Sequence, residues 1–217
     1  ADKEWAHEQH SRFSAFIDAL KGAGVTFNIH HCCNSAGTLE LPDFHREMIR
    51  PGIIQYGYDA SKEVLVTGTK IKPVMSLRCC ITHLKTIYEG DCVGYGRHFT
   101  AKGPTKIATL PIGYADGYNR ALSSKIDVIV HGVRAHQVGN ICMDQCMIDV
   151  SHIPNVKVGD EVVLFGEQGS ECVSADEIAD TCHTIIHEIT CNINRRVPRV
   201  YVQNGKIVQR LEYLTQS

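Results

Sequence analysis

The feature that most constrains the fold is a series of short β-rich segments that begins near Val74 and occupies most of the chain. The clearest of them span residues 75–86, 105–110, 126–130 and 161–165, and each is bounded by glycine, proline or aspartate. Apolar and β-branched runs of this length between turn-forming residues are typical of an all-β domain. The pattern therefore predicts a mainly β, barrel-like domain over residues 62–217.

One helix is expected to interrupt this β domain. Ser174 is a suitable N-cap, and Glu177 stands three residues later, as in a capping box. We therefore expect a helix to begin at this point of the chain.

The first part of the chain alternates between helical and strand-like patterns. Apolar residues recur at helical spacing over residues 5–20, and glycines follow, which predicts an amphipathic helix. Residues 25–29 are expected to form a short strand, followed by a polar loop at residues 31–37, and residues 48–56 are apolar enough for a buried strand. A small α/β domain is expected over residues 1–61, with ligands bound at the strand ends.

Charge and hydropathy limit the class of partner. The formal net charge is -2 and the pI is about 6.7, so the chain has no broad basic field for nucleic acid or an anionic membrane surface. No stretch approaches the roughly 20 apolar residues that cross a bilayer. We expect a small-molecule partner, no nucleic acid and no membrane contact by this segment.

The cysteines and the first residues suggest a cellular context. The ten cysteines lie in apolar runs such as residues 75–81, and we expect no signal peptide in this chain. Mostly reduced, buried thiols and a cytoplasmic location are therefore expected. The chain begins with Ala1 and enters a helical pattern almost at once, so we expect a longer parent chain, which could carry a membrane domain.

Tyr114 stands in the segment Gly113-Tyr-Ala-Asp-Gly117, directly after an expected strand. Taken alone, such a segment is usually a hairpin turn. A loop tyrosine can also act as a general base if neighbouring cations stabilise its phenolate, because a free phenol has a pKa of about 10. The choice between turn and base depends on the other motifs of the chain.

Several other motifs accompany Tyr114, and together they are far more specific than one. They are Val138-Gly-Asn-Ile-Cys-Met-Asp-Gln145, His31-Cys-Cys-Asn-Ser-Ala-Gly37, Met48-Ile-Arg-Pro-Gly-Ile53, Val93-Gly-Tyr-Gly96 and Arg195-Arg-Val-Pro-Arg199. In this arrangement they resemble the alanine racemase family, whose enzymes use pyridoxal 5'-phosphate (PLP). The resemblance extends from the first helix nearly to the C-terminus.

The resemblance implies a fold and a reaction. Residues 1–61 would be the remnant of a PLP-binding (β/α)8 barrel, and residues 62–217 the family's C-terminal β domain. The family forms a head-to-tail homodimer in which the β domain of one subunit completes the partner's site. Its enzymes interconvert L- and D-alanine with two bases, the lysine that carries PLP and a tyrosine, which Tyr114 resembles.

The resemblance also implies which residues hold the cofactor. Arg50 would face the pyridine nitrogen, and His31 would orient it. Ser35 and the backbone of Gly52 and Ile53 would bind the phosphate. Because arginine stays protonated, it cannot give a full proton to the ring nitrogen, which weakens the ring as an electron sink.

On the substrate side, Met143 resembles the residue whose backbone N–H contacts the substrate carboxylate, with Asp144 beside it. Two positions depart from the family. Asn140 stands where an arginine is usual, and His187 replaces a tyrosine that contacts the PLP phosphate and borders the substrate pocket. A smaller, more polar residue there could admit serine, as in the racemases of glycopeptide resistance, so alanine and serine both stay open.

The PLP lysine of the family, found early in the barrel in a segment resembling Val-Lys-Ala-Asn-Ala-Tyr-Gly, has no counterpart in this sequence. A barrel of this type takes about 250 residues, and only about 60 precede the β domain. Strands without neighbours expose unpaired edges. We expect the first residues to rearrange, to pair with another copy or to be partly mobile, and the chain alone to be inactive.

Two other interpretations of the sequence place the chain in different functional classes. A metal-binding module is suggested by His30-His31-Cys32-Cys33, but metal sites usually space their ligands, so no metal site is expected. The second reading is a non-catalytic dimerisation or interaction domain built from the β domain.

Overall fold

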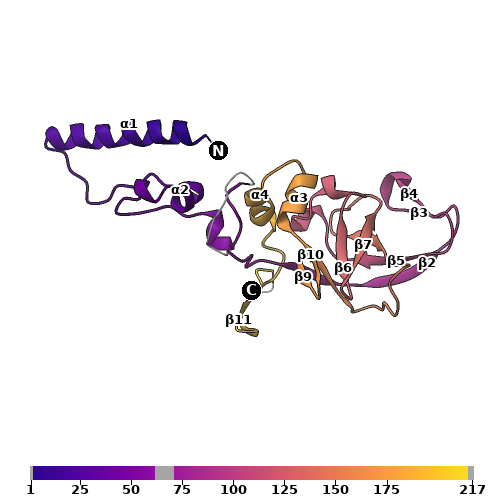
Figure 1. The fold of residues 1–217 in the computed structure, drawn as a ribbon. Coiled ribbons are helices and arrows are strands. Elements are labelled where there is room, and N and C mark those ends of the chain that lie inside the picture. Colours follow the sequence, from indigo (N-terminus) through magenta and orange to yellow (C-terminus); the bar gives the residue numbers. More distant parts are fainter. Residues whose placement is uncertain (1, 62–70, 215–217) are drawn as a thin grey trace. The chain divides into compact units, whose positions relative to one another are not determined.

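The computed structural model describes residues 2–61 and 71–214 (Figure 1). The chain divides into two compact units, residues 1–74 and 75–217. The boundary expected after residue 61 adjoins residues 62–70, which lie outside the described residues, so its position stays a prediction.

The first unit begins with the expected helix, α1 (Lys3–Gly22). The Asp2 side chain caps it by accepting a hydrogen bond from the backbone N–H of Trp5 at 2.9 Å. After the helix, Gly24 adopts a φ of +80°, a left-handed conformation that glycine reaches without strain. No residue of α1 is fully buried, and its apolar residues Phe13, Ile17 and Leu20 are half-buried.

The two strands expected in the first unit are wrong. Residues 25–29 have no regular structure, and residues 53–56 form a one-turn 3-10 helix, η2 (Ile53–Tyr56). A buried parallel strand needs neighbours on both sides for its backbone hydrogen bonds, and residues 2–61 contain no strand that could pair with it. Phe27 and Ile29, which belong to the first of these expected strands, are more than half exposed.

Two short helical segments organise the rest of this unit. They are α2 (Ser35–Glu40) and η1 (Pro42–Phe44), a 3-10 turn. Phe44 is buried, and its ring stacks on that of His10 in α1 with centroids 4.0 Å apart. This contact holds α1 against the segment that contains α2.

The second unit is mainly β, as expected. Its strands are β1 (Leu77–Cys80), β2 (His83–Ile87), β3 (Cys92–Val93), β4 (Phe99–Thr100), β5 (Thr105–Leu110), β6 (Asp127–Val130), β7 (Val133–Val138), β8 (Cys146–Asp149), β9 (Glu161–Gln168), β10 (Glu171–Val173), β11 (Arg199–Gln203) and β12 (Lys206–Leu211). Its helices are η3 (Tyr95–Arg97), η4 (Tyr114–Asp116), η5 (Arg120–Leu122), α3 (Ala175–Thr181) and α4 (Ile186–Asn192). The strands predicted at residues 105–110 and 126–130 correspond to β5 and β6.

The main sheet is antiparallel and curls back on itself without closing. Its strands pair in the order β1-β9-β6-β7-β8-β5-β2, and β10 pairs with β9. The end strands, β1 and β2, do not pair with each other, so the expected barrel stays open. They are joined only by Ile81 and Thr82, whose N–H groups bond to the carbonyls of Asp160 and Thr109 at 3.0 Å each.

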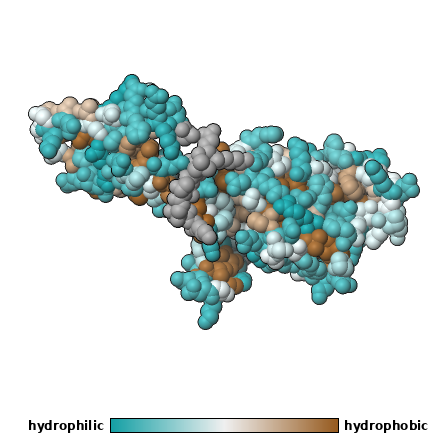
Figure 2. All heavy atoms as spheres, viewed as in Figure 1, coloured by the Kyte–Doolittle hydropathy of each residue, from teal (hydrophilic) through white to brown (hydrophobic). Residues whose placement is uncertain are grey.

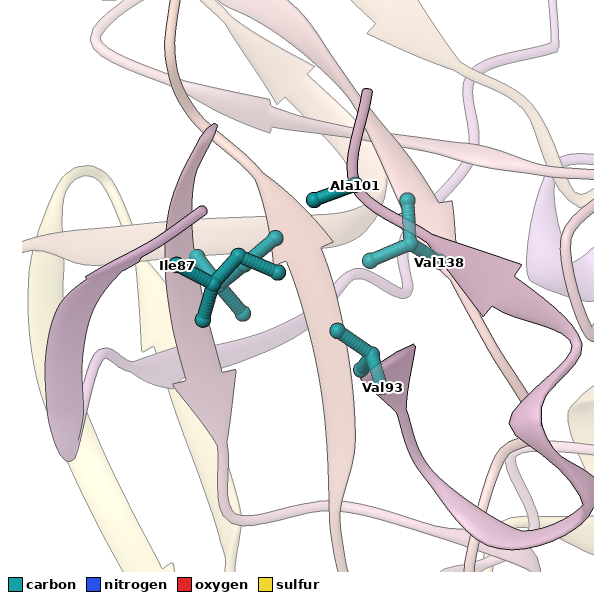
Figure 3. Packing of buried hydrophobic residues seen from close by; sticks show 5 residues of the cluster. Ile87, Val93, Ala101 and Val138 are labelled. Carbon is teal, nitrogen blue, oxygen red and sulfur yellow. The ribbon is translucent and has the colours of Figure 1, made fainter. Parts of the chain in front are cut away.

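The core is formed by the buried side chains of this curved sheet. Residues 128–130 of β6 and 162–164 of β9 are fully buried, which explains their continuous apolar runs. A second cluster is formed by Ile87, Val93, Ala101, Ile107 and Val138 (Figure 3). It packs the small β3–β4 ribbon against the main sheet.

Helix α3 begins where its sequence predicted. The Ser174 hydroxyl accepts a hydrogen bond from the N–H of Glu177 at 3.1 Å. The other half of the expected capping box is replaced, because the Glu177 carboxylate binds the guanidinium of Arg134 at 2.8 and 3.0 Å. The helix is thereby attached to β7.

The β11–β12 hairpin is separate from the main sheet and carries exposed apolar residues. Figure 2 shows hydrophobic side chains on its surface, and Val202, Ile207 and Val208 are each more than half exposed. Within the described residues, no helix is long and apolar enough to cross a membrane.

All ten cysteines are free thiols, but the expectation that most are buried is wrong. Only Cys33 and Cys146 are buried, and Cys80, Cys172 and Cys191 are exposed. Alternate residues of a strand point to opposite faces, so an apolar run such as 75–81 places some of its thiols on the solvent side.

A buried hydroxyl without a partner gives a stability prediction. Tyr118 is fully buried, and its Oη has no hydrogen-bond partner among the described atoms. Because an unpaired buried hydroxyl costs about 1–3 kcal/mol, Tyr118→Phe is expected to raise the free energy of unfolding by about 1 kcal/mol. Urea unfolding measures this, with the exposed Tyr201→Phe as the control. A loss of stability in Tyr118→Phe would contradict the prediction.

The cysteines are predicted to differ in reactivity. Hydrogen bonds from Thr100 and from the Arg97 guanidinium lower the pKa of Cys92, whereas burial raises the pKa of Cys79 to about 12. Because the thiolate is the nucleophile, iodoacetamide near pH 8 should alkylate Cys92 before Cys79. Arg97→Gln should slow labelling of Cys92 alone, as followed by mass spectrometry. An unchanged rate in that variant would show that Arg97 does not activate the thiol.

Candidate functional site

Tyr114 lies just beyond the end of β5, at the start of η4, with 44% of its surface exposed. Its backbone N–H donates to the carbonyl of Cys142 at 3.0 Å, and the N–H of Ala115 donates to the carbonyl of Met143 at 2.8 Å. Two consecutive hydrogen bonds thus join the two loops that the sequence had singled out. These bonds fix the backbone of Tyr114 relative to that of Met143.

Two glycines make this close approach possible. A Cβ atom on Gly113 would lie 2.2 Å from the carbonyl oxygen of Cys142, which no side chain can tolerate. Gly117 has a φ of +100°, and a Cβ there would lie 2.2 Å from the carbonyl oxygen of Asn192. The Tyr114 loop is therefore packed between the backbone of residues 142–143 on one side and that of α4 on the other.

Asp116 closes the Tyr114 loop from inside. Its carboxylate accepts a hydrogen bond from the N–H of Gly113 at 2.9 Å and pairs with Nε of Arg196 at 3.0 Å. The Asp116 side chain is only 9% exposed, whereas that of Arg196 is 39% exposed. The backbone N–H of Asn194 also donates to the Asp116 carbonyl at 2.9 Å.

Met143 and Asp144 form the tip of the neighbouring loop. The N–H of Cys142 donates to the carbonyl of Gln145 at 2.8 Å and closes a tight turn. Met143 and Asp144 are both exposed at this turn, beside the Tyr114 loop. The turn presents their backbone and side chains to whatever binds at this edge of the second unit.

Asn140, which stands where the family usually has an arginine, forms a hydrogen bond with the loop that contains η3. Its Nδ2 donates to the carbonyl of Tyr95 at 2.8 Å and fixes the loop that contains η3. Tyr95 itself is 79% exposed. Asn140 therefore connects the β3–β4 ribbon to the strand end that leads to Met143.

In the first unit, the structure brings Arg50 and His31 together. The Arg50 guanidinium lies within hydrogen-bonding distance of Nδ1 of His31 and donates to the carbonyl of Cys32 at 3.3 Å. The Arg50 backbone N–H donates to the carbonyl of Cys33 at 2.9 Å. Both side chains are exposed, so the paired guanidinium and imidazole face outward from residues 31–33 and 50.

Ser35 and Gly52 form a second contact in this unit. Ser35 begins α2, is buried, and accepts a hydrogen bond from the N–H of Gly52 at 2.9 Å through its hydroxyl. Ile53 begins η2, and the first N–H groups of a helix have no acceptor within it. A hydroxyl, the first N–H groups of η2 and the absence of a side chain at Gly52 suit an anion such as phosphate.

Glu47 holds the loop that precedes His31. Its carboxylate accepts hydrogen bonds from the backbone N–H of His30 at 2.9 Å and from Nδ1 of the same residue at 3.0 Å. His30 and Glu47 thus connect the two chain segments that carry His31 and Arg50. Within the described residues, no three His, Cys, Asp or Glu side chains are grouped to hold a metal ion.

The expected site residues therefore form two groups, one in each unit. His31, Ser35, Arg50, Gly52 and Ile53 belong to the first unit, and Tyr114, Met143, Asp144 and His187 to the second. His187 is exposed in the first turn of α4. Its expected place near the phosphate involves residues of the other unit and stays a prediction.

Sequence reasoning missed the roles of Asp116, Arg196 and Glu47. Asp116 and Arg196 both lie in motifs that were noted, but nothing local in either motif indicates that the other is its partner. Glu47 has no motif that marks it. Its contact with His30 depends on a loop whose path only the folded unit defines.

Comparison with known families matches both parts of the chain. The family model described as "Alanine racemase, C-terminal domain" matches residues 74–201, and the one described as "Alanine racemase, N-terminal domain" matches residues 1–60. The C-terminal match covers more than half of the chain.

Similar proteins carry the same description. "Alanine racemase 1" of Clostridium acetobutylicum is 46% identical over 213 residues, which are 98% of this chain and 55% of that protein. The alanine racemase of Clostridium tetani is also 46% identical, over 214 residues, again 55% of its length. The chain thus spans about half the length of the curated relatives it matches.

Solved structures agree with these matches. The alanine racemase of Clostridium difficile 630 in complex with cycloserine has a TM-score of 0.92 at 41% identity and covers 98% of this chain and 56% of its own. The alanine racemase of Bacillus anthracis with bound L-Ala-P has a TM-score of 0.93 at 36% identity and covers 99% of this chain and 55% of its own.

The Glu47 contact gives a pH prediction. Hydrogen bonds from its own backbone N–H and from His30 lower the pKa of Glu47 to about 2. A lowered pKa in the folded state stabilises the protein above the unfolded value, near 4.5, and this contribution is lost as the pH falls through about 2. The His30 amide resonance should therefore titrate with a midpoint near 2 in NMR spectra.

The matched variant for this measurement is Glu47→Gln, which keeps the size of the side chain but does not titrate. It should abolish the acid transition at the His30 amide, whereas Asp18→Asn on the exposed face of α1 should leave it unchanged. A midpoint near 4.5 in the unmodified chain would show that Glu47 does not hold His30 in solution.

Proposed function

The chain belongs to the alanine racemase family, and on that premise we propose that it forms part of a PLP-dependent enzyme that interconverts L- and D-alanine. The observation that carries the proposal is the joined pair of loops at Tyr114 and Met143. One loop offers a group that can move a proton, and the other offers a backbone N–H for the substrate carboxylate. Racemisation needs both at a fixed spacing.

We assign Tyr114 as one of two bases. A proton must leave one face of the substrate α-carbon and another must arrive on the opposite face, so a single side chain cannot serve both faces efficiently. Tyr114 and Met143 are 44% and 57% exposed in the isolated chain. This exposure supports the view that they complete the site of a partner subunit in a homodimer.

The first unit fits the phosphate end of PLP. Ser35 would donate its hydroxyl, and the N–H of Ile53 would bind phosphate oxygens over Gly52, where a side chain would fill the space. When bound, PLP withdraws electrons from the substrate α-carbon and so acidifies its proton. Arg50 would face the ring nitrogen, with His31 orienting its guanidinium.

Arg50 would also limit the chemistry at this site. A guanidinium has a pKa above about 12 and cannot give its proton to the ring nitrogen. It can only donate a hydrogen bond there, so less negative charge is drawn into the ring. This arrangement favours rapid return of the proton to the α-carbon over side reactions.

Alanine is the proposed substrate because the relatives and solved structures described above are all called alanine racemases. The other base of the family is a lysine in a segment that this sequence lacks. We therefore propose that these 217 residues alone do not racemise alanine, and that activity needs the part of the protein that carries this lysine.

The decisive variant is Tyr114→Phe in the holoenzyme that contains this chain. Exchange of the α-hydrogen with deuterated water is measured by NMR for each alanine enantiomer separately. Loss of a general base typically costs about 100-fold or more, so exchange should fall by that factor for one enantiomer and persist for the other. The exposed Tyr88→Phe is the matched control and should exchange both enantiomers normally. Unchanged exchange in Tyr114→Phe would overturn the assignment.

A further inference from the structure

The motif Arg195-Arg-Val-Pro-Arg199 has no part in the function proposed so far, although it stands out in the sequence. It follows α4 directly and lies against the Tyr114 loop. Its arginines have different partners, so each can be assigned a separate structural role. Only one of them reaches the loop that carries Tyr114.

Arg199 stabilises the backbone of the motif and of the residues just before it. Its guanidinium donates to the carbonyls of Ile193 at 2.6 Å, Val197 at 3.1 Å and Asn194 at 3.3 Å. The backbone N–H of Arg196 also donates to Oδ1 of Asn194 at 3.0 Å. These bonds fold residues 193–199 into a compact turn with a fixed backbone.

Arg196 connects this turn to the Tyr114 loop. Its Nε pairs at 3.0 Å with Oδ1 of Asp116, whose other carboxylate oxygen accepts the N–H of Gly113. Gly113 and Asp116 flank Tyr114 and Ala115, the residues whose N–H groups bond to residues 142 and 143. The ion pair therefore closes a continuous chain of contacts from the Arg196 turn through Tyr114 to Met143.

The Asp116 carboxylate depends on Arg196 because it is almost completely buried. A charge left without its partner in such a place is costly, so the surrounding loop rearranges to admit water. The loop that would move is the one that carries Tyr114. A displacement of about 1 Å in a reacting group can cost about 100-fold in rate.

We propose that Asp116 and Arg196 are positioning residues that align Tyr114 with the substrate held at Met143. The inference rests on the proposed function for its catalytic consequence, but its structural part does not. Arg195 is a suitable control, because its guanidinium lies over the ring of Tyr213 at 5.7 Å and is not part of the Asp116 contact.

The structural part is tested on the 217-residue chain by amide hydrogen exchange of Tyr114 and Ala115. Arg196→Gln should accelerate exchange at these two amides by about tenfold or more, Arg196→Lys should do so less, and Arg195→Gln should have no effect. If Arg196→Gln proves poorly folded, Asp116→Asn removes the charge pair while keeping an acceptor for Gly113. Equal protection in all variants would overturn the inference.

The catalytic part is tested in the holoenzyme by α-hydrogen exchange of each enantiomer. Arg196→Gln should slow exchange about 100-fold for the enantiomer that Tyr114→Phe affects, and Arg196→Lys should restore part of the rate. Exchange of the other enantiomer should stay near the original rate. A merely structural role would instead reduce both enantiomers equally, because it would lower the amount of folded enzyme.

The outcomes separate the two proposals. If Tyr114→Phe changes the exchange rate of neither enantiomer, the proposed function fails. The ion pair then has no catalytic role, even if Arg196→Gln accelerates exchange at the amides of Tyr114 and Ala115. If Tyr114→Phe is selective but Arg196→Gln is not, the function stands and the positioning role is overturned.

Discussion

A strand keeps its conformation only where its backbone N–H and C=O groups find partners, and this requirement separates the two parts of the chain. In the second unit, each strand of the main sheet has an antiparallel neighbour, and the buried centre is formed by β6 and β9. Residues 2–61 contain no strand, so their strand-like sequences adopt loops and short helices. The same physical rule thus explains both the order of one unit and the exposed apolar residues of the other.

The candidate site of the second unit is built at the ends of paired strands. β5 ends before Gly113, and β8 begins just after the turn at Met143, so the pairing of β5 with β8 brings the two loops side by side. Gly113 permits contact between their backbones, and the Asp116 carboxylate accepts a hydrogen bond from the Gly113 N–H across the Tyr114 loop. Rigid strands therefore determine where the flexible side chains of the site can lie.

Local sequence signals predicted several elements of the fold. Helix α1 appears where the spacing of apolar residues and the following glycines predicted it, α3 begins at the predicted N-cap Ser174, and β5 has the predicted bounds. The strands expected at residues 25–29 and 48–56 failed because their partners are not supplied by nearby sequence.

The candidate site was predictable only through its motifs. The structure places His31 beside Arg50 and joins the loops of Tyr114 and Met143, while the catalytic and binding roles of these residues stay predictions. The ion pair of Asp116 with Arg196 joins distant parts of the chain, and no local spacing rule could indicate it. The partner of Glu177 likewise depended on the position of Arg134 in the sheet.

The joined loops of Tyr114 and Met143 also have a consequence for how such a protein can change during evolution. Because the backbones of the two loops are bonded to each other, a substitution that shifts one also shifts the other. Under the proposed function, adapting substrate recognition there would disturb proton transfer. Helix α4 meets the Tyr114 loop at its last residue, Asn192, whereas His187 is exposed in the first turn of the helix. New substrate preferences would therefore arise more readily on α4 than in the two loops.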